Sequence, residues 1–161
     1  MSAHAVNAQD AVSPAALVER ISALLAGERD FIANAANAAA AVYFGLRDVN
    51  WVGVYRLAGG ELVVGPFCGK PACVRIALGS GVCGTAAMRQ ETVVVDDVAQ
   101  FESHIACDPA SRSEIVVPII GPSGLVGVLD VDSPVYARFG PLERAALEAV
   151  AGLVVTGSDV A

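Results

Sequence analysis

The sequence predicts an α+β domain in which an antiparallel sheet of about six strands is flanked by N- and C-terminal helices. Three observations support this fold class. The chain has 161 residues, which suits one domain with a full hydrophobic core. Apolar residues make up 55% and charged residues 17%, a composition that excludes a disordered chain. Segments with helical periodicity lie at the two ends, and segments with strand periodicity, joined by short turns, lie between them.

Two helices are expected before the sheet. Ser13 is a typical helix cap and Pro14 suits the first helical position, and the apolar residues that follow recur at helical spacing. A second helix, rich in alanine, is expected over residues 30–46. Residues 1–12 are expected to form a flexible arm in front of a single domain that covers residues 13–161.

From Trp51 the apolar pattern changes to the period of two that is typical of strands. The expected strands are residues 51–57, 61–65, 73–78, 92–95, 114–120 and 125–132. A short helix is expected over residues 79–88, and a final helix begins at Pro141. Residues 96–113 show no clean period, and an irregular segment of this length inside a compact domain usually carries function.

Charge and targeting features exclude several classes of partner. The net charge is −7, the isoelectric point is about 4.6 and Lys70 is the only lysine, so the surface lacks the clustered cations that bind nucleic acid or an anionic membrane. The longest uncharged stretch, residues 31–46, is shorter than the about 20 apolar residues of a membrane-spanning helix. The N-terminus has no basic start and no apolar run, so we expect no signal peptide and a cytoplasmic location.

The chain has four cysteines, Cys68, Cys73, Cys83 and Cys107. In a reducing cytoplasm such a group is more often catalytic than a set of persistent disulfides. Cys107 lies in a polar, turn-forming context, which is typical of a reactive thiol. There is no C-x-x-C pair, and His104-x-x-Cys107 has no second pair at ligand spacing. The sequence therefore predicts no metal site and no cofactor.

The segment from Gly79 to Gly84 matches G-x-G-x-x-G between an expected strand and a helix. A dinucleotide-binding fold needs repeated parallel βαβ crossovers, whereas this chain is built from hairpins, so we expect no dinucleotide there. The motif still places free backbone N–H groups at a helix N-terminus, which suits a carboxylate or a thiolate. The alternative is that these glycines only make the turn.

Two further groups of residues share a sheet face. Asp130 and Asp132 point the same way on the last expected strand, and Glu114 opens the neighbouring strand. Three converging acids favour binding of an ammonium group or retention of a proton for acid catalysis, and the alternative is a solvated strand end. Trp51 and Tyr55 share a face with a glycine between them, which predicts either an aromatic-lined gap or ordinary core packing.

Several segments carry a resemblance to a known family: GKPACVRI (69–76), GVCGTA (81–86), HIACD (104–108), SEIVVP (113–118) and LDVDS (129–133). With these segments the chain resembles the free methionine-(R)-sulfoxide reductases built on a GAF domain, from about Asn50 to the final helix. The resemblance implies a GAF-like fold and an oxidoreductase that converts free L-methionine-(R)-sulfoxide to L-methionine.

The resemblance also implies roles for the cysteines. Cys107 would attack the sulfoxide sulfur and be left as a sulfenic acid. Cys73 would be the main resolving cysteine, forming a disulfide that thioredoxin reduces, and Cys83 would be an auxiliary thiol. Cys68 is not among the working cysteines of the family, and it would be inert or a competing disulfide partner.

The remaining implied roles concern the substrate. Glu114, Asp130 and Asp132 would bind its polar groups and help to protonate the sulfoxide oxygen, while Trp51 and Tyr55 would enclose its methyl–sulfur end. The resemblance further implies a homodimer. The alternative function is a non-catalytic GAF module that binds a small molecule or senses oxidation.

Overall fold

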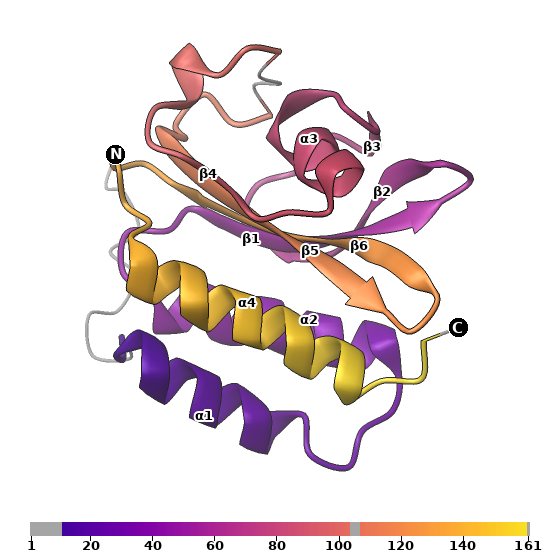
Figure 1. Ribbon diagram of the computed structural model, residues 1–161. Helices are drawn as coiled ribbons and strands as arrows, with labels where there is room; N and C mark the ends of the chain where they lie inside the picture. The colour runs from indigo at the N-terminus through magenta and orange to yellow at the C-terminus, as the bar shows by residue number, and fades with distance from the viewer. Residues whose placement is uncertain (1–10, 104–106, 161) are drawn as a thin grey trace.

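The computed structural model describes residues 11–103 and 107–160, and it confirms the predicted α+β class (Figure 1). Residues 1–10 of the expected arm lie outside the described residues. The helices are α1 (Pro14–Leu24), α2 (Phe31–Gly45), α3 (Gly81–Arg89) and α4 (Pro141–Thr156), with a short 3-10 turn η1 (Val98–Gln100). The strands are β1 (Trp51–Ala58), β2 (Glu61–Cys68), β3 (Arg75–Ala77), β4 (Val93–Val95), β5 (Ser113–Gly121) and β6 (Gly124–Ser133). None of the described helices is both long and apolar enough to cross a membrane.

The six strands form one antiparallel sheet in the order β3-β2-β1-β6-β5-β4. The hairpins β1–β2 and β5–β6 are those that the sequence predicts, and β1 pairs with β6 at the centre. The third strand is shorter than the predicted range 73–78, because the carbonyl group of Cys73 accepts a hydrogen bond from the Tyr55 hydroxyl rather than from a neighbouring strand. Cys73 therefore lies in an irregular segment before β3.

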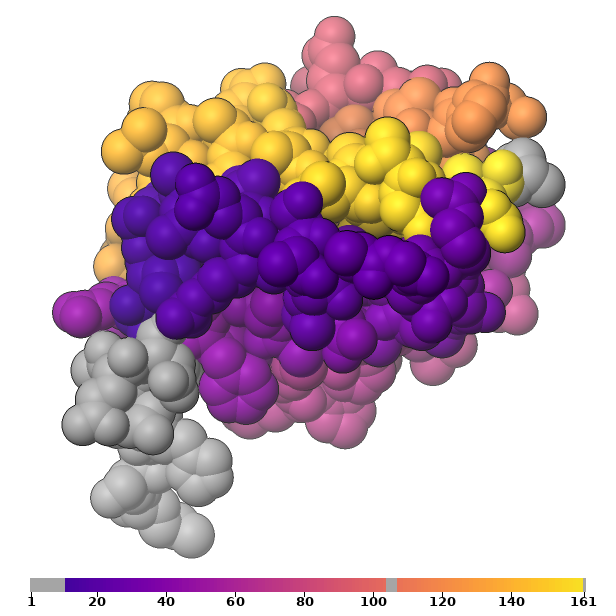
Figure 2. Space-filling view, turned by 90° about the horizontal axis from the view of Figure 1, so that it is seen from below, coloured from indigo at the N-terminus to yellow at the C-terminus, as the bar shows by residue number. Residues whose placement is uncertain are grey.

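Helices cover both faces of the sheet (Figure 1). Helices α2 and α4 pack on one face, and α1 packs on both of them, so that α1 and α4 lie side by side when the molecule is seen from this side (Figure 2). The flanking by N- and C-terminal helices is thus confirmed. Helix α3 lies on the opposite face with the segment around η1, and a second apolar core forms beneath it.

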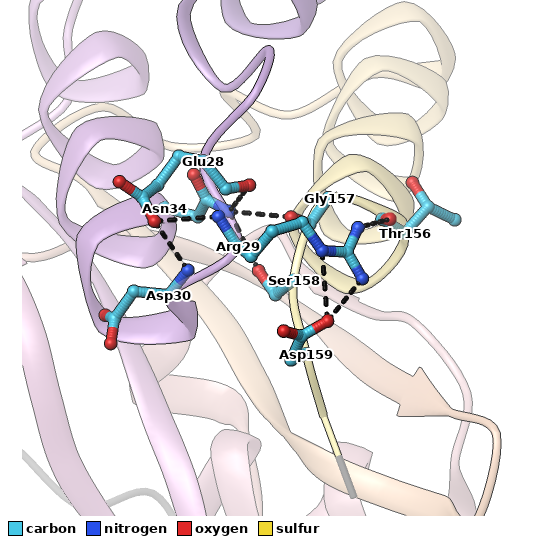
Figure 3. A network of polar contacts seen from close by, with 8 residues as sticks. All are labelled: Glu28, Arg29, Asp30, Asn34, Thr156, Gly157, Ser158 and Asp159. Atoms are coloured by element: carbon cyan, nitrogen blue, oxygen red, sulfur yellow. Dashed lines mark hydrogen bonds and ion pairs between the residues drawn. The ribbon is translucent and has the colours of Figure 1, made fainter.

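A polar network fixes the helical layer at the start of α2 (Figure 3). The amide of the buried Asn34 donates to the carbonyl groups of Glu28 at 3.2 Å and Gly157 at 3.1 Å. Arg29 pairs with Asp159 nearby, although both side chains are exposed and such a pair contributes little to stability. Asn34 is therefore a buried link between the start of α2 and the chain after α4.

Candidate active site

Three carboxyl groups lie together on the face of the sheet that α3 covers. Glu114 on β5 is the direct cross-strand partner of Asp132 on β6, and Asp130 lies two residues earlier on the same face. Glu114 and Asp130 are only 7% and 5% exposed, and Asp132 is half-buried. The acids thus converge as their strand positions predict, in a buried setting rather than at a solvated strand end.

Helix α3 adds a thiol to these acids. The Sγ atom of Cys83 lies 3.9 Å from Oε1 of Glu114 and donates a weak hydrogen bond to it. One sulfur or oxygen atom from each of Cys83, Glu114 and Asp130 lies within 4.8 Å of the others. Oδ1 of Asp130 is buried and has no hydrogen-bond partner among the described residues. Because an unpaired buried carboxylate is costly, this cluster needs a proton or a cation.

Burial and mutual repulsion hold protons in the cluster. Burial, then the charges of Asp130 and Asp132, raises the pKa of Glu114 well above its usual value. Burial raises the pKa of Asp130 to about 6, and burial with the charge of Asp130 raises the pKa of Asp132. Burial and the neighbouring acids also raise the pKa of the Cys83 thiol. At neutral pH the pocket therefore keeps protons that solvated carboxyl groups would have lost.

These raised pKa values predict that the protein loses stability as the pH rises. The unfolded chain releases its carboxyl protons near pH 4 (about 3.9 for aspartate), whereas folded Asp130 keeps its proton until about pH 6. The folded state thus binds more protons in this window, and its free energy of unfolding falls by about 3 kcal/mol from Asp130 alone. Urea unfolding of the reduced protein at about pH 4 and about pH 7 measures the fall. Asp130→Asn should show a smaller fall in the free energy of unfolding between these two pH values. An equal fall in the variant and the wild type would contradict the raised pKa of Asp130.

Two of the cysteines are joined in the structure. Cys73 and Cys107 form a disulfide with 5.8 Å between their Cα atoms, linking the segment before β3 to the segment before β5. Cys68 and Cys83 are free. Cys68 is the partner of Val52 in the β1–β2 ladder, and Val52 belongs to the core on the α2 and α4 side. Because cross-strand partners share a face, Cys68 points away from the disulfide. This favours an inert Cys68 over a Cys68 that competes for a disulfide bond.

Trp51 and Tyr55 on β1 hold the segment that carries Cys73. The indole Nε1 of Trp51 donates to the carbonyl of Lys70 at 3.0 Å, and the hydroxyl of Tyr55 donates to the carbonyl of Cys73 at 3.1 Å. Of the two alternatives for these rings, the structure favours packing over a gap at Gly53. A Cβ atom at Gly53 would lie 2.3 Å from the Trp51 ring, so the ring itself occupies the space that the glycine leaves.

The glycine-rich segment before α3 makes a tight turn. Gly79 and Gly81 have φ angles of 85° and 61°, which favour glycine. A Cβ atom at Gly84 would lie 2.3 Å from the carbonyl oxygen of Ala77, so glycine also lets α3 approach β3. Ser80 makes no side-chain cap, and the amide groups of the first turn have no partner within the helix. This helix start can therefore accept a carboxylate.

A pocket lies among these elements. Its lining includes all but one of the predicted site residues, namely Trp51, Tyr55, Cys83, Cys107, Glu114, Asp130 and Asp132. The exception, Cys73, is joined to the pocket through its disulfide to Cys107. His104, which was considered together with Cys107 as half of a metal site, lies outside the described residues.

Two residues that shape the pocket were not predicted. The Nδ2 atom of Asn50 donates to Oδ2 of Asp108 at 3.3 Å and to Oγ of Ser111 at 3.2 Å. Asn50 therefore holds the segment that follows Cys107 in place. The ring of Phe67 stacks on Trp51 with 5.4 Å between ring centres. These contacts join residues far apart in the chain, so no local period indicated them.

Known proteins share this fold and much of this sequence. Residues 26–156 match the family model of the GAF domain. The chain is 52% identical over 118 residues to the free methionine-R-sulfoxide reductase of Escherichia coli, covering 73% of this chain and 72% of that protein. The chain belongs to the GAF-domain free methionine-R-sulfoxide reductase family. The resemblance expected from the sequence motifs is therefore confirmed.

Solved structures of free methionine-R-sulfoxide reductases superpose closely on this chain. The enzyme of Neisseria meningitidis in complex with its substrate has a TM-score of 0.85 at 39% identity, covering 89% of this chain and 87% of that one. The reduced form of fRMsr from Staphylococcus aureus has a TM-score of 0.87 at 44% identity, covering 89% of this chain and 94% of that one. The expected GAF-like fold is confirmed by these likenesses.

Proposed function

We propose that this chain uses its own thiols to reduce free L-methionine-(R)-sulfoxide to L-methionine. The observation that carries the proposal is the Cys73–Cys107 disulfide beside a pocket whose buried acids retain protons. A pair of thiols supplies the two electrons of the reduction, and the acids supply the proton that makes the sulfoxide sulfur electrophilic. The similar proteins from Escherichia coli and Neisseria meningitidis are named for this activity.

In the first step Cys107 acts as the nucleophile. Its sulfur bonds to the sulfoxide sulfur as Glu114, Asp130 or Asp132 gives a proton to the sulfoxide oxygen. The oxygen then passes to Cys107, methionine leaves with its sulfur reduced, and Cys107 is left as a sulfenic acid. Cys107 lines the same pocket as the three acids, which supports this division of roles.

In the second step Cys73 resolves the sulfenic acid. Its sulfur displaces the hydroxyl group, which leaves as water, and the disulfide between Cys73 and Cys107 is formed. Cys83 serves as an auxiliary thiol in the same pocket. Thioredoxin, itself a dithiol, then returns the disulfide to two thiols by exchange.

The pocket offers a partner for each part of a free amino acid. The ammonium group of the substrate pairs with the acids, among which Oδ1 of Asp130 has no hydrogen-bond partner within residues 11–103 and 107–160. The α-carboxylate meets the first-turn amide groups of α3. Trp51 and Tyr55 enclose the methyl–sulfur end. A substrate whose amine is blocked loses the cation, so peptide-bound sulfoxide is excluded.

A coupled assay with thioredoxin, thioredoxin reductase and NADPH tests the proposal. We expect NADPH oxidation with free methionine-(R)-sulfoxide and none with the free S epimer, N-acetylmethionine sulfoxide or a sulfoxide-containing peptide. Comparable rates with the N-acetylated compound would defeat the preference for the free amino acid. Binding of a small molecule without any turnover would instead support a non-catalytic GAF module.

Replacing Cys73 by serine is expected to leave a single turnover. Cys107 can still be oxidised once, but the thiol that closes the disulfide is gone, so about one equivalent of methionine per chain is released before the reaction stalls. Methionine counted by chromatography, with thioredoxin present, measures this burst. Cys68→Ser is the matched control and should turn over like the wild type. Sustained turnover by Cys73→Ser would refute Cys73 as the indispensable resolver.

Replacing Tyr55 by phenylalanine is expected to slow resolution more than sulfoxide reduction. The ring stays in the pocket, but the hydrogen bond to the carbonyl of Cys73 is lost. One such bond contributes about 1 kcal/mol, so disulfide closure should slow roughly fivefold. Rapid-quench measurement of methionine release and of disulfide formation separates the two steps. The exposed Tyr136, replaced in the same way, is the control, and equal slowing of both steps by Tyr55→Phe would contradict a positioning role.

We also propose a homodimer and a cytoplasmic location. The family resemblance supports the dimer, and a reaction that returns its cysteines to thiols suits a reducing compartment. Analytical ultracentrifugation of the reduced and the oxidised protein tests the dimer.

A further inference from the structure

The cluster of Cys83, Glu114 and Asp130 has a composition that substrate binding alone does not explain. Its members come from three elements, α3, β5 and β6, and their side chains are 4%, 7% and 5% exposed. One sulfur and two carboxylate oxygens lie within 4.8 Å of one another. Carboxylates suit an ammonium group, but a cysteine sulfur is a poor acceptor for one. Besides its proposed role as an auxiliary thiol, this sulfur makes the cluster suited to a metal cation.

A second observation also points to a bound cation. Oδ1 of Asp130 is buried and has no hydrogen-bond partner among the described residues, and Asp130 lines the pocket. The nearby hydroxyl of Tyr55 is directed to the carbonyl of Cys73 instead. Since buried polar atoms in native proteins are almost always paired, an unpartnered carboxylate oxygen beside a thiol leaves a position that a bound cation can fill in place of a proton.

We propose that Cys83, Glu114 and Asp130 form a binding site for a thiophilic divalent cation of the zinc class. One thiolate and two carboxylates are ligands that zinc takes in proteins, and three protein ligands leave a fourth position open to the pocket. Magnesium and calcium prefer oxygen ligands alone, so the sulfur selects against them. Binding displaces the protons that the three groups hold and involves no oxidation or reduction.

The cation and the substrate exclude one another. This mutual exclusion rests on the proposed function, because the ammonium group of the proposed substrate needs the same carboxylates. A zinc-class ion in the pocket therefore acts as a reversible competitive inhibitor and occupies Cys83 at the same time. The site is independent of the disulfide, since Cys83 stays free when Cys73 and Cys107 are joined.

Binding of Co²⁺ to the oxidised protein tests the site. With Cys73 and Cys107 joined, only Cys68 and Cys83 carry thiols, and a thiolate bound to Co²⁺ gives a charge-transfer band in the near ultraviolet. We expect this band to saturate at one ion per chain and to disappear when Zn²⁺ is added. Cys83→Ser should lose the band, and Cys68→Ser, whose cysteine faces the other side of the sheet, should keep it. Glu114→Gln retains the thiol and should weaken Co²⁺ binding by at least about 10–100-fold, which is the cost of losing even an outer-shell partner of a ligand.

Competition completes the test. L-methionine should displace Co²⁺ from the oxidised protein, whereas N-acetylmethionine should not. Absence of the band in folded wild type, its survival in Cys83→Ser or its loss in Cys68→Ser would overturn the site. Displacement by neither compound, in a protein that turns over free sulfoxide, would overturn the exclusion and leave the proposed function intact. Co²⁺ binding without any turnover would leave the site intact and overturn the function.

Discussion

Cys107→Ser is expected to abolish reduction of free methionine-(R)-sulfoxide. A serine hydroxyl is a far weaker nucleophile towards sulfur than a thiolate, and it forms neither a sulfenic acid nor a disulfide. Loss of a catalytic nucleophile lowers kcat/KM by roughly 10⁴-fold or more, which puts the variant below detection in the coupled assay. Retained turnover by Cys107→Ser would mean that Cys73 or Cys83, rather than Cys107, is the nucleophile.

The control for this variant is its stability. Cys107 is half-buried in a loop segment and is not among the residues of either apolar core of the described chain, so the reduced variant should unfold within a few degrees of the reduced wild type. The oxidised wild type is the wrong reference, because its disulfide restricts the unfolded chain. A large drop in the melting temperature would mean that the loss of activity reports unfolding rather than chemistry.

Amide replacement of the acids is expected to have the second-largest effect. Glu114→Gln, Asp130→Asn and Asp132→Asn each keep the shape of the side chain and remove its acid. General acid catalysis contributes about 10²–10⁴-fold, so kcat/KM should fall by at least the lower figure in one or more of the three variants. The exposed Glu91, changed to glutamine, is the matched control and should have no effect.

The triple amide variant shows whether the acids act as one unit. Their side chains line one pocket, and the charge of Asp130 raises the pKa of both Glu114 and Asp132, so their contributions are not independent. The triple variant should be little worse than the worst single variant. Three single variants that all keep wild-type kcat/KM would show that these carboxyl groups have no part in the reaction.

The acids could be located from the sequence because a strand has a fixed period. Alternation along residues 125–132 puts Asp130 and Asp132 on one face, and this step needs no tertiary information. The position of Glu114 opposite Asp132 could not be counted from the turn, because an irregularity between Ile119 and Ile120 shifts the β5–β6 register by one residue. The burial of the acids also needs tertiary information, because α3 covers this face and only the folded chain shows on which side of the sheet α3 packs.

The thiols and the aromatic residues were less accessible to sequence reasoning. The pairing of Cys73 with Cys107 joins two irregular segments and was expected only through the family resemblance. The Trp51 ring fills the space over Gly53 because Lys70 accepts its N–H, a contact that no local period shows. A search for ligand spacing likewise missed the cluster around Cys83, since its members come from three separate elements.

A single-turnover experiment on the fully reduced protein tests most directly whether its own thiols reduce the substrate. The protein is freed of reductant and mixed with excess racemic methionine sulfoxide, and methionine, remaining thiols and residual epimers are then counted. We expect about one methionine per chain, loss of about two thiols, consumption of the R epimer alone, and a peptide map that links Cys73 to Cys107. Methionine formed without loss of thiols, or thiols lost without formation of methionine, would contradict a reaction carried by these cysteines.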